Sequence, residues 1–302
     1  MSVGRTAIGL AAGLAAFALA VAGCSSEHGS GHGAVPVVAT TAAWGSVASA
    51  VAGEHASVTS IEKGANADPH SFEATPADIA AITDASLVVV NGGGYDHWVD
   101  DVLAGDPEIN AVDAYSLRNP AKPANEHVFY DVLVAKAVAA EIAKRLGEID
   151  SANADEYRAN ATKFGQQADE IAARERAIGQ AHPSGAVVAT EPVAYYLLRT
   201  AGIADRTPPG FANAVEEGDD PAPADVAAML DLIDSRQVSV LLFNPQTETA
   251  ATKQIEDAAR RVGLPVVSVS ETLPEGVDYL TWQRDTAEEL ARQFDKAAQT
   301  NR

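Results

Sequence analysis

Apolar residues follow two patterns along the chain from residue 35 onward. Short apolar runs bounded by turn residues are typical of buried strands, and longer segments with apolar residues every three or four positions are typical of helices. Strands are expected at residues 35–40, 56–61, 86–91, 109–114, 186–190, 238–243 and 265–270. Helices are expected at residues 44–53, 76–84, 95–105, 128–147, 152–181, 193–202, 224–236 and 251–263, with a terminal helix from about Leu280. This alternation predicts an α/β fold with largely parallel sheets and helices on their faces.

The helix expected at residues 152–181 differs from the others in its length. Its apolar stripe consists of Tyr157, Ala161, Phe164, Ala168, Ile171 and Ile178. At about 1.5 Å per residue it would be about 40 Å long, enough to run the length of a domain. Residues 35–150 and 184–302 are therefore predicted to form two α/β lobes, which residues 151–183 join. Within the second lobe, residues 206–223 are expected to form an irregular acidic loop.

The N-terminus has the pattern of a secretory signal. Arg5 precedes an apolar stretch that is too short for a comfortable membrane span and that ends in Val-Ala-Gly-Cys. Because this ending resembles a bacterial lipobox, residues 1–23 are predicted to be a signal peptide and Cys24 to carry lipid. Residues 24–34 are small and polar, and we expect a flexible tether there. The chain is thus expected to be exported and anchored, as a lipoprotein, to the outer face of the cell membrane.

Cysteine content and charge exclude several classes of protein. Cys24 is the only cysteine, so neither an intramolecular disulfide nor a thiolate metal cluster can form. The formal net charge is −21 and no basic cluster is present, which argues against a nucleic-acid partner. An acidic field attracts cations, although a surface that serves only solubility is the simpler explanation. His28 and His32 are interpreted as solvated tether residues, with weak collection of metal as the alternative.

One histidine lies in a loop before a well-marked helix start. His70 precedes Thr75, Pro76 and Asp78, which have the pattern of an N-cap, a first helical residue and a capping-box acid. A histidine held in such a loop is suited to presenting a ring nitrogen to a ligand. An ordinary loop histidine is the alternative that the spacing alone leaves open.

Three further side chains stand at comparable junctions. His127 directly precedes the helix expected at residues 128–147. Glu191 and Glu271 each follow an apolar strand, with only one small residue between. Ligands of parallel sheets approach the carboxyl ends of the strands, which makes these positions candidates for binding. Taken singly, each glutamate is more simply explained as the cap of the next helix.

Residues 68–98 resemble a segment of the zinc- and manganese-binding cluster of ABC-transporter solute-binding proteins. Both contain Asp/Glu-Pro-His, an aromatic residue, Glu, Pro-x-Asp, a strand and Asn-Gly in this order. A looser resemblance continues across the mature chain. It implies two α/β lobes joined by one long rigid helix, with a metal ion held in the cleft by two side chains from each lobe. It also implies a monomer that is not an enzyme and that delivers its ion to a membrane permease.

The resemblance implies four metal ligands. His70 matches the first histidine of the family and His127 the second, although this chain lacks the proline of the family's His-x-Trp-x-Asp-Pro pattern. Glu191 matches the third ligand. The fourth is usually an aspartate after the last core strand, and Glu271 occupies that place here. Asp278 is the alternative fourth ligand if the loop aligns differently.

This ligand set bears on the identity of the metal. Two imidazoles and two carboxylates neutralise a dication and favour Mn²⁺, with Zn²⁺ as a close alternative because of its higher intrinsic affinity. The long histidine-rich loop of many zinc-binding members is absent between Asn119 and Glu126. Asn244 and Gln246 are candidates for donors that orient the ligands from behind, and a simple turn explains them equally well.

Two other functions compete with metal capture. A metallohydrolase needs an open metal position and a general base, and the sequence contains neither a His-Glu-x-x-His helix nor a serine elbow. A surface adhesin or structural lipoprotein, in which the candidate ligands are incidental, is the second alternative. Residues 91–96, Asn-Gly-Gly-Gly-Tyr-Asp, lack the spacing of a phosphate loop and are interpreted as a tight turn.

Overall fold

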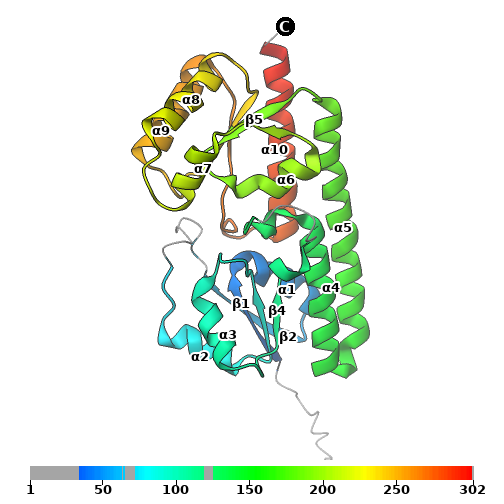
Figure 1. The fold of residues 1–302 in the computed structure, drawn as a ribbon. Coiled ribbons are helices and arrows are strands. Elements are labelled where there is room, and N and C mark those ends of the chain that lie inside the picture. Colours follow the sequence, from blue (N-terminus) through cyan, green and yellow to red (C-terminus); the bar gives the residue numbers. More distant parts are fainter. Residues whose placement is uncertain (1–33, 63, 65–71, 119–124, 301–302) are drawn as a thin grey trace, which may run out of the picture. The chain divides into compact units, whose positions relative to one another are not determined.

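The computed structural model describes residues 34–62, 64, 72–118 and 125–300 (Figure 1). Cys24, His28, His32 and His70 lie outside the described residues, as does the predicted signal peptide. Residues 34–302 form one compact unit. Among the described helices, none combines the length and the hydropathy that a bilayer span requires.

The first sheet contains four parallel strands in the order β2-β1-β3-β4. The strands are β1 (Val35–Thr41), β2 (Ala56–Glu62), β3 (Leu87–Val90) and β4 (Ala111–Asp113). The α-helices of this half are α1 (Ala42–Ala52), α2 (Pro76–Asp84), α3 (Asp100–Gly105) and α4 (Val132–Ile149). Short 3₁₀ turns lie at His97–Val99, Tyr115–Leu117 and Val128–Tyr130. Every residue of β3 is buried, as expected for a parallel strand with both faces covered.

The second sheet repeats this arrangement with the strand order β6-β5-β7-β8, again all parallel. Its strands are β5 (Ala186–Ala189), β6 (Ala204–Asp205), β7 (Val240–Phe243) and β8 (Val266–Ser268). Its helices are α6 (Tyr195–Ala201), α7 (Pro209–Glu216), α8 (Pro223–Asp234), α9 (Ala250–Val262) and α10 (Tyr279–Thr300), with a 3₁₀ turn at Pro192–Ala194. The two parallel sheets confirm the predicted α/β class.

The long helix α5 (Ala154–Ala181) follows a 3₁₀ turn at Ser151–Asn153 and contains 28 residues. All six residues of its predicted apolar stripe are buried. It packs against α1 and α4 of the first half and against α6 and α10 of the second (Figure 1). Gly179 allows α6 to approach closely, because a Cβ atom there would lie 1.8 Å from the carbonyl oxygen of Ala201. A single helix therefore contacts the helices of both sheets.

The expectation of an irregular loop at residues 206–223 is wrong, because α7 lies within it. Pro209 occupies the first turn, where a missing backbone N–H costs nothing. Phe211 and Val215 are four residues apart, share one face and are buried in the core of the second half. Tertiary burial thus stabilises a helix of only eight residues, too short to be stable alone.

The two halves are joined by hydrogen bonds from buried tyrosines as well as by α5. Tyr130 donates its hydroxyl to the carbonyl of Ser270 (2.9 Å), and Tyr279 donates to the carbonyl of Phe129 (2.7 Å). Tyr196 donates to the carbonyl of Asn125 (2.8 Å). The segment that precedes α4 is therefore held against the segments that follow β5 and β8.

Candidate metal centre

Three polar side chains of the second half follow neighbouring parallel strands. Glu191 follows β5, Asn244 follows β7 and Glu271 follows β8. Because β7 lies between β5 and β8, Asn244 is positioned between the two glutamates at the carboxyl edge of the sheet. The exposed fractions of Glu191, Asn244 and Glu271 are 2%, 0% and 3%. The strand order thus brings two buried carboxylates to either side of one amide.

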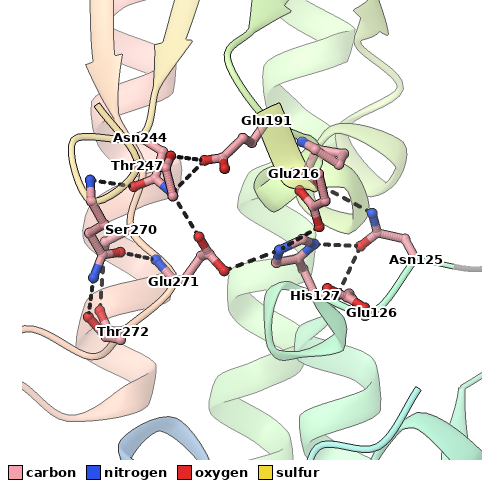
Figure 2. A network of polar contacts seen from close by, with 12 residues as sticks. Asn125, Glu126, His127, Glu191, Glu216, Asn244, Thr247, Ser270, Glu271 and Thr272 are labelled. Carbon is pink, nitrogen blue, oxygen red and sulfur yellow. Dashed lines mark hydrogen bonds and ion pairs between the residues drawn. The ribbon is translucent and has the colours of Figure 1, made fainter. Parts of the chain in front are cut away.

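The side chain of Asn244 connects these two carboxylates directly. Its Nδ2 donates to Oε2 of Glu191 (2.6 Å) and to Oε1 of Glu271 (2.8 Å) (Figure 2). Thr247 adds a hydroxyl donor to Oε2 of Glu191 (2.5 Å). Gln246 accepts from the backbone N–H of Glu271 (2.7 Å) and so fixes the loop that carries it. The other oxygen of Glu191, Oε1, is buried and accepts no hydrogen bond from the described residues.

His127 faces these carboxylates from the first half and is fully buried. Oδ1 of Asn125 accepts from the backbone N–H of His127 (2.9 Å) and lies 3.2 Å from its Nδ1. An amide oxygen can only accept, so in the neutral ring Nδ1 carries the proton and Nε2 is the nitrogen that can bind a metal. The rings of Tyr95 and Phe129 pack edge-on against the imidazole, with centroids 5.8 and 5.7 Å away.

Carboxylates from two different segments of the second half converge on Nε2 of His127. Oε2 of Glu271 lies 3.4 Å from it, and Oε1 of Glu216 lies 3.5 Å from it (Figure 2). Glu126 completes a group in which one ligand atom each from Glu126, His127 and Glu216 lies within 4.8 Å of the others. The site therefore contains more carboxylates than the two expected from the sequence.

The electrostatics of the site reflect this concentration of negative charge. Burial raises the pKa of Glu191 to about 7, and the charge of Glu271 contributes to the rise, against hydrogen bonds from Thr247 and Asn244 that lower it. Burial acts to lower the pKa of His127, but the hydrogen bond to Glu271 and the charge of Glu216 outweigh it and raise the pKa. Without a cation, the site therefore favours bound protons at both positions.

The remaining candidates from the sequence occupy other places. Asp278 lies at the N-terminal end of α10, where its carboxylate accepts from the backbone N–H and from the hydroxyl of Thr281 (3.0 and 2.7 Å). His70 lies outside the described residues, but the helix start that follows it is confirmed. The backbone N–H of Asp78 donates to the Thr75 hydroxyl, and the backbone N–H of Thr75 donates to the Asp78 carboxylate.

Sequence reasoning missed several members of the site. No pattern in the sequence distinguishes Asn125 or Thr247 from ordinary loop residues. Glu216 falls in the segment expected to be irregular, although the four-residue spacing of Phe211 and Val215 is a helical signal that locates it. Thr247 and Glu216 act through contacts with segments distant in sequence, whereas Asn125 acts on the histidine two residues away.

The donor set determines what the site can bind. Imidazole nitrogen and carboxylate oxygen are ligands of divalent transition metals, and buried carboxylates that lie near one another are stabilised by a cation. Oε1 of Glu191 is a buried acceptor that such a cation would satisfy. The residues present therefore fit a divalent metal ion.

Comparison with curated proteins finds relatives that are named for metal binding. The manganese-binding lipoprotein MntA of Halalkalibacterium halodurans is 31% identical over 166 residues, which cover 51% of this chain and 54% of that protein. The chain thus spans about half the length of this relative. MntA of Bacillus subtilis is 23% identical over 269 residues, which cover 82% of this chain and 83% of that protein.

Solved structures share the fold. The periplasmic zinc-binding protein TroA from Treponema pallidum matches with a TM-score of 0.74 at 16% identity, covering 87% of this chain and 99% of that one. FpvC from Pseudomonas aeruginosa, in complex with Mn²⁺, matches with a TM-score of 0.70 at 22% identity over 87% and 99% of the chains. Residues 37–293 match the family described as ZnuA, zinc-uptake complex component A periplasmic. Since this match extends over far more than half of the chain, the protein belongs to the ZnuA family of periplasmic solute-binding proteins, which serve metal transporters and are not enzymes.

Proposed function

We propose that this protein captures one divalent transition metal ion outside the cell membrane and delivers it to an ABC-transporter permease. The proposed ligands are His127, Glu191 and Glu271, together with His70, which lies outside the described residues. Manganese is the favoured ion and zinc the close alternative, because carboxylate-containing sets suit Mn²⁺ better than imidazole-rich sets do.

One observation carries this proposal, namely that a single amide nitrogen of Asn244 donates to both Glu191 and Glu271. Two buried carboxylates held this close repel each other unless a proton or a cation compensates their charge. A dication supplies two positive charges and also binds the oxygen of Glu191 that accepts no hydrogen bond from the described residues. The arrangement is therefore suited to a divalent ion more than to a neutral or anionic ligand.

The relatives support the class of ligand. Both curated relatives are named manganese-binding lipoproteins, one solved neighbour is a complex with Mn²⁺, and another is named a zinc-binding protein. Family membership also removes the metallohydrolase alternative, because the family consists of substrate-binding proteins.

Export, anchoring and architecture belong to the same proposal. A lipid on Cys24 and a flexible tether at residues 24–34 would keep a monomeric binding protein near its permease. The lipoprotein names of the relatives support such an anchor. Two lobes at residues 35–150 and 184–302, joined by residues 151–183, would be restrained by the contacts of α5 with helices of both halves.

Metal stoichiometry and affinity test the proposal. We expect the purified protein to bind one equivalent of Mn²⁺ or Zn²⁺, measured by mass spectrometry of metal content and by chelator competition. His127→Ala, His70→Ala and Glu191→Gln each remove a proposed ligand, and each is expected to weaken binding by about 100-fold or more, since loss of an outer-shell partner alone costs about 10- to 100-fold. His55→Ala is the matched control, because its ring contacts Glu156 at the surface (2.9 Å).

The outcomes separate the function from the ligand assignment. Wild-type protein that takes up no stoichiometric metal would show that the proposed function is wrong. If only His70→Ala retains wild-type affinity, the function stands and that one ligand is misassigned.

A further inference from the structure

The last residue of α7 brings a second carboxylate, besides that of Glu271, to the imidazole of His127. Glu216 is the final residue of this helix, and its Oε1 lies 3.5 Å from Nε2 of His127 (Figure 2). The corresponding distance for Glu271, a proposed ligand, is 3.4 Å. Glu216 and Glu271 thus have the same relationship to the nitrogen that would bind metal.

The position of Glu216 is set by packing and not by a mobile surface loop. Phe211 and Val215 anchor α7 in the core of the second half, with exposed fractions of 0% and 4%. Gly218, with φ of +73°, lets the chain turn away directly after the helix. The Glu216 side chain is 19% exposed, whereas the neighbouring Glu217 is an exposed residue. The fold therefore directs one of two adjacent glutamates into the site.

These distances match those between donor atoms of one coordination sphere. Two donors that each lie about 2.1 Å from one ion are about 3.4 Å apart in a tetrahedral sphere and about 3.0 Å apart in an octahedral one. Glu271 and Glu216, at 3.4 and 3.5 Å from Nε2 of His127, both lie within about 0.5 Å of these separations. Independently, Oε1 of Glu191 is a buried oxygen without a hydrogen-bond partner among the described residues, which itself points to a ligand at this place.

We infer that Glu216 is a direct carboxylate ligand of the captured ion and favours Mn²⁺ over Zn²⁺. The inference rests on the proposed function and deepens it. Zn²⁺ in closed sites takes four ligands in a tetrahedron, a number that the four proposed ligands already supply. Mn²⁺ accepts octahedral, oxygen-rich spheres, so an additional carboxylate binds to it without displacing another ligand. Glu216 therefore adds more to the affinity for Mn²⁺ than to that for Zn²⁺.

The test compares Glu216→Gln with Glu217→Gln in the full chain. Both variants remove one carboxylate charge at adjacent positions, and glutamine keeps the shape of the side chain. Affinities for Mn²⁺ and Zn²⁺ are measured by chelator competition, and the electron paramagnetic resonance spectrum of bound Mn²⁺ reports its coordination. We expect Glu216→Gln to weaken Mn²⁺ binding at least tenfold, to change Zn²⁺ binding less than threefold and to alter the spectrum. Glu217→Gln should leave all three unchanged.

Other outcomes overturn the inference. An equal loss for both metals means that Glu216 acts only through its charge, and unchanged Mn²⁺ affinity means that it does not act at all. A melting temperature of metal-free Glu216→Gln below that of metal-free wild type identifies a folding defect. Glu216→Asp then repeats the comparison with the carboxylate drawn back by one methylene. Wild-type protein that binds neither metal overturns the proposed function itself, and this inference with it.

Discussion

Nε2 of His127 lies 3.4 Å from Oε2 of Glu271, although the first residue precedes α4 and the second follows β8. A hydrogen bond from Tyr130 to the carbonyl of Ser270 holds the same two segments together. The metal centre and the contact between the two halves are therefore parts of one structure. A substitution that shifts either segment is expected to change metal affinity before it unfolds the protein.

Asn244→Ala is expected to weaken metal binding by about 10- to 100-fold, the usual effect of removing a donor that orients a ligand. The substitution removes both hydrogen bonds that position Glu191 and Glu271 and leaves their buried oxygens without this donor. Chelator competition measures the loss. Asn213→Ala, at an exposed position of α7, should retain wild-type affinity. Equal affinities of the two variants would mean that Asn244 does not orient the carboxylates.

The metal-free protein is expected to lose stability as the pH rises from about 4.5 to about 7. The pKa of Glu191 is raised from the ordinary value of 4.5 to about 7, so the folded protein keeps a proton that the unfolded chain has lost. The proton on Glu191 adds about 3 kcal/mol to the free energy of unfolding below about pH 4.5, and this addition is lost as the pH rises to about 7. The raised pKa of His127 acts in the same direction at higher pH.

Urea unfolding at several pH values, with chelator present, measures this dependence. Other carboxylates also titrate, so the informative quantity is the difference between wild type and Glu191→Gln. We expect the variant to lack the decline that Glu191 causes between about pH 5 and 7. Saturating metal binds the deprotonated carboxylate, so it should restore stability most strongly at the upper end of this pH range. If the free energy of unfolding changed with pH in the same way in wild type and in Glu191→Gln, the raised pKa would not belong to Glu191.

Asn125→Ala is expected to weaken metal binding by about 10- to 100-fold through His127. The alanine lacks the amide oxygen that accepts a hydrogen bond from Nδ1–H of His127. The His127 ring can then adopt the tautomer that carries its proton on Nε2, the nitrogen proposed to bind the metal. At pH 8 we expect Asn125→Ala to lose more metal affinity than its change in melting temperature alone would explain. Nitrogen-15 chemical shifts of the His127 ring report the tautomer directly. An unchanged tautomer together with full affinity would refute this role.

Gly179→Ala is expected to lower the free energy of unfolding by about 2 to 4 kcal/mol, because the new Cβ atom would overlap the backbone of α6. Its position would be 1.8 Å from the carbonyl oxygen of Ala201. Gly165→Ala in the same helix is the control. There the nearest atom is Cγ of the flexible Lys136 side chain at 3.2 Å, and the change should stay within about 1 kcal/mol. Urea unfolding of both variants distinguishes a close helix contact from a general effect of glycine in α5.

The fold was predictable because its elements have strong local patterns. Buried parallel strands such as Leu87–Val90 appear in the sequence as short apolar runs. The stripe on α5 appears as a run of three- and four-residue steps. By contrast, α7 follows one proline and begins with a second proline and a glycine, and its buried apolar residues are only Phe211 and Val215. Its stability comes from the core it packs against, which local sequence does not reveal.

For the site, the sequence predicted only the position of each residue relative to its own strand. The sequence places Glu191, Asn244 and Glu271 after strands, but it does not state which strands are neighbours. The order β5-β7-β8 is a tertiary property, and it alone puts the amide between the two acids. Glu216 depends in turn on where α7 packs. Contacts between segments distant in sequence therefore decide how Asn244 and Glu216 meet the other residues of the site.

The amide bridge of Asn244 has a consequence for the thermodynamics of capture. Because Glu191 and Glu271 are already linked through one nitrogen, their rotamers are restricted before any ion arrives. Ordering a long side chain on binding typically costs about 0.5 to 1.5 kcal/mol, and here that cost is met during folding. The ion therefore encounters a preorganised pair of acids, and a larger share of the coordination energy remains as affinity.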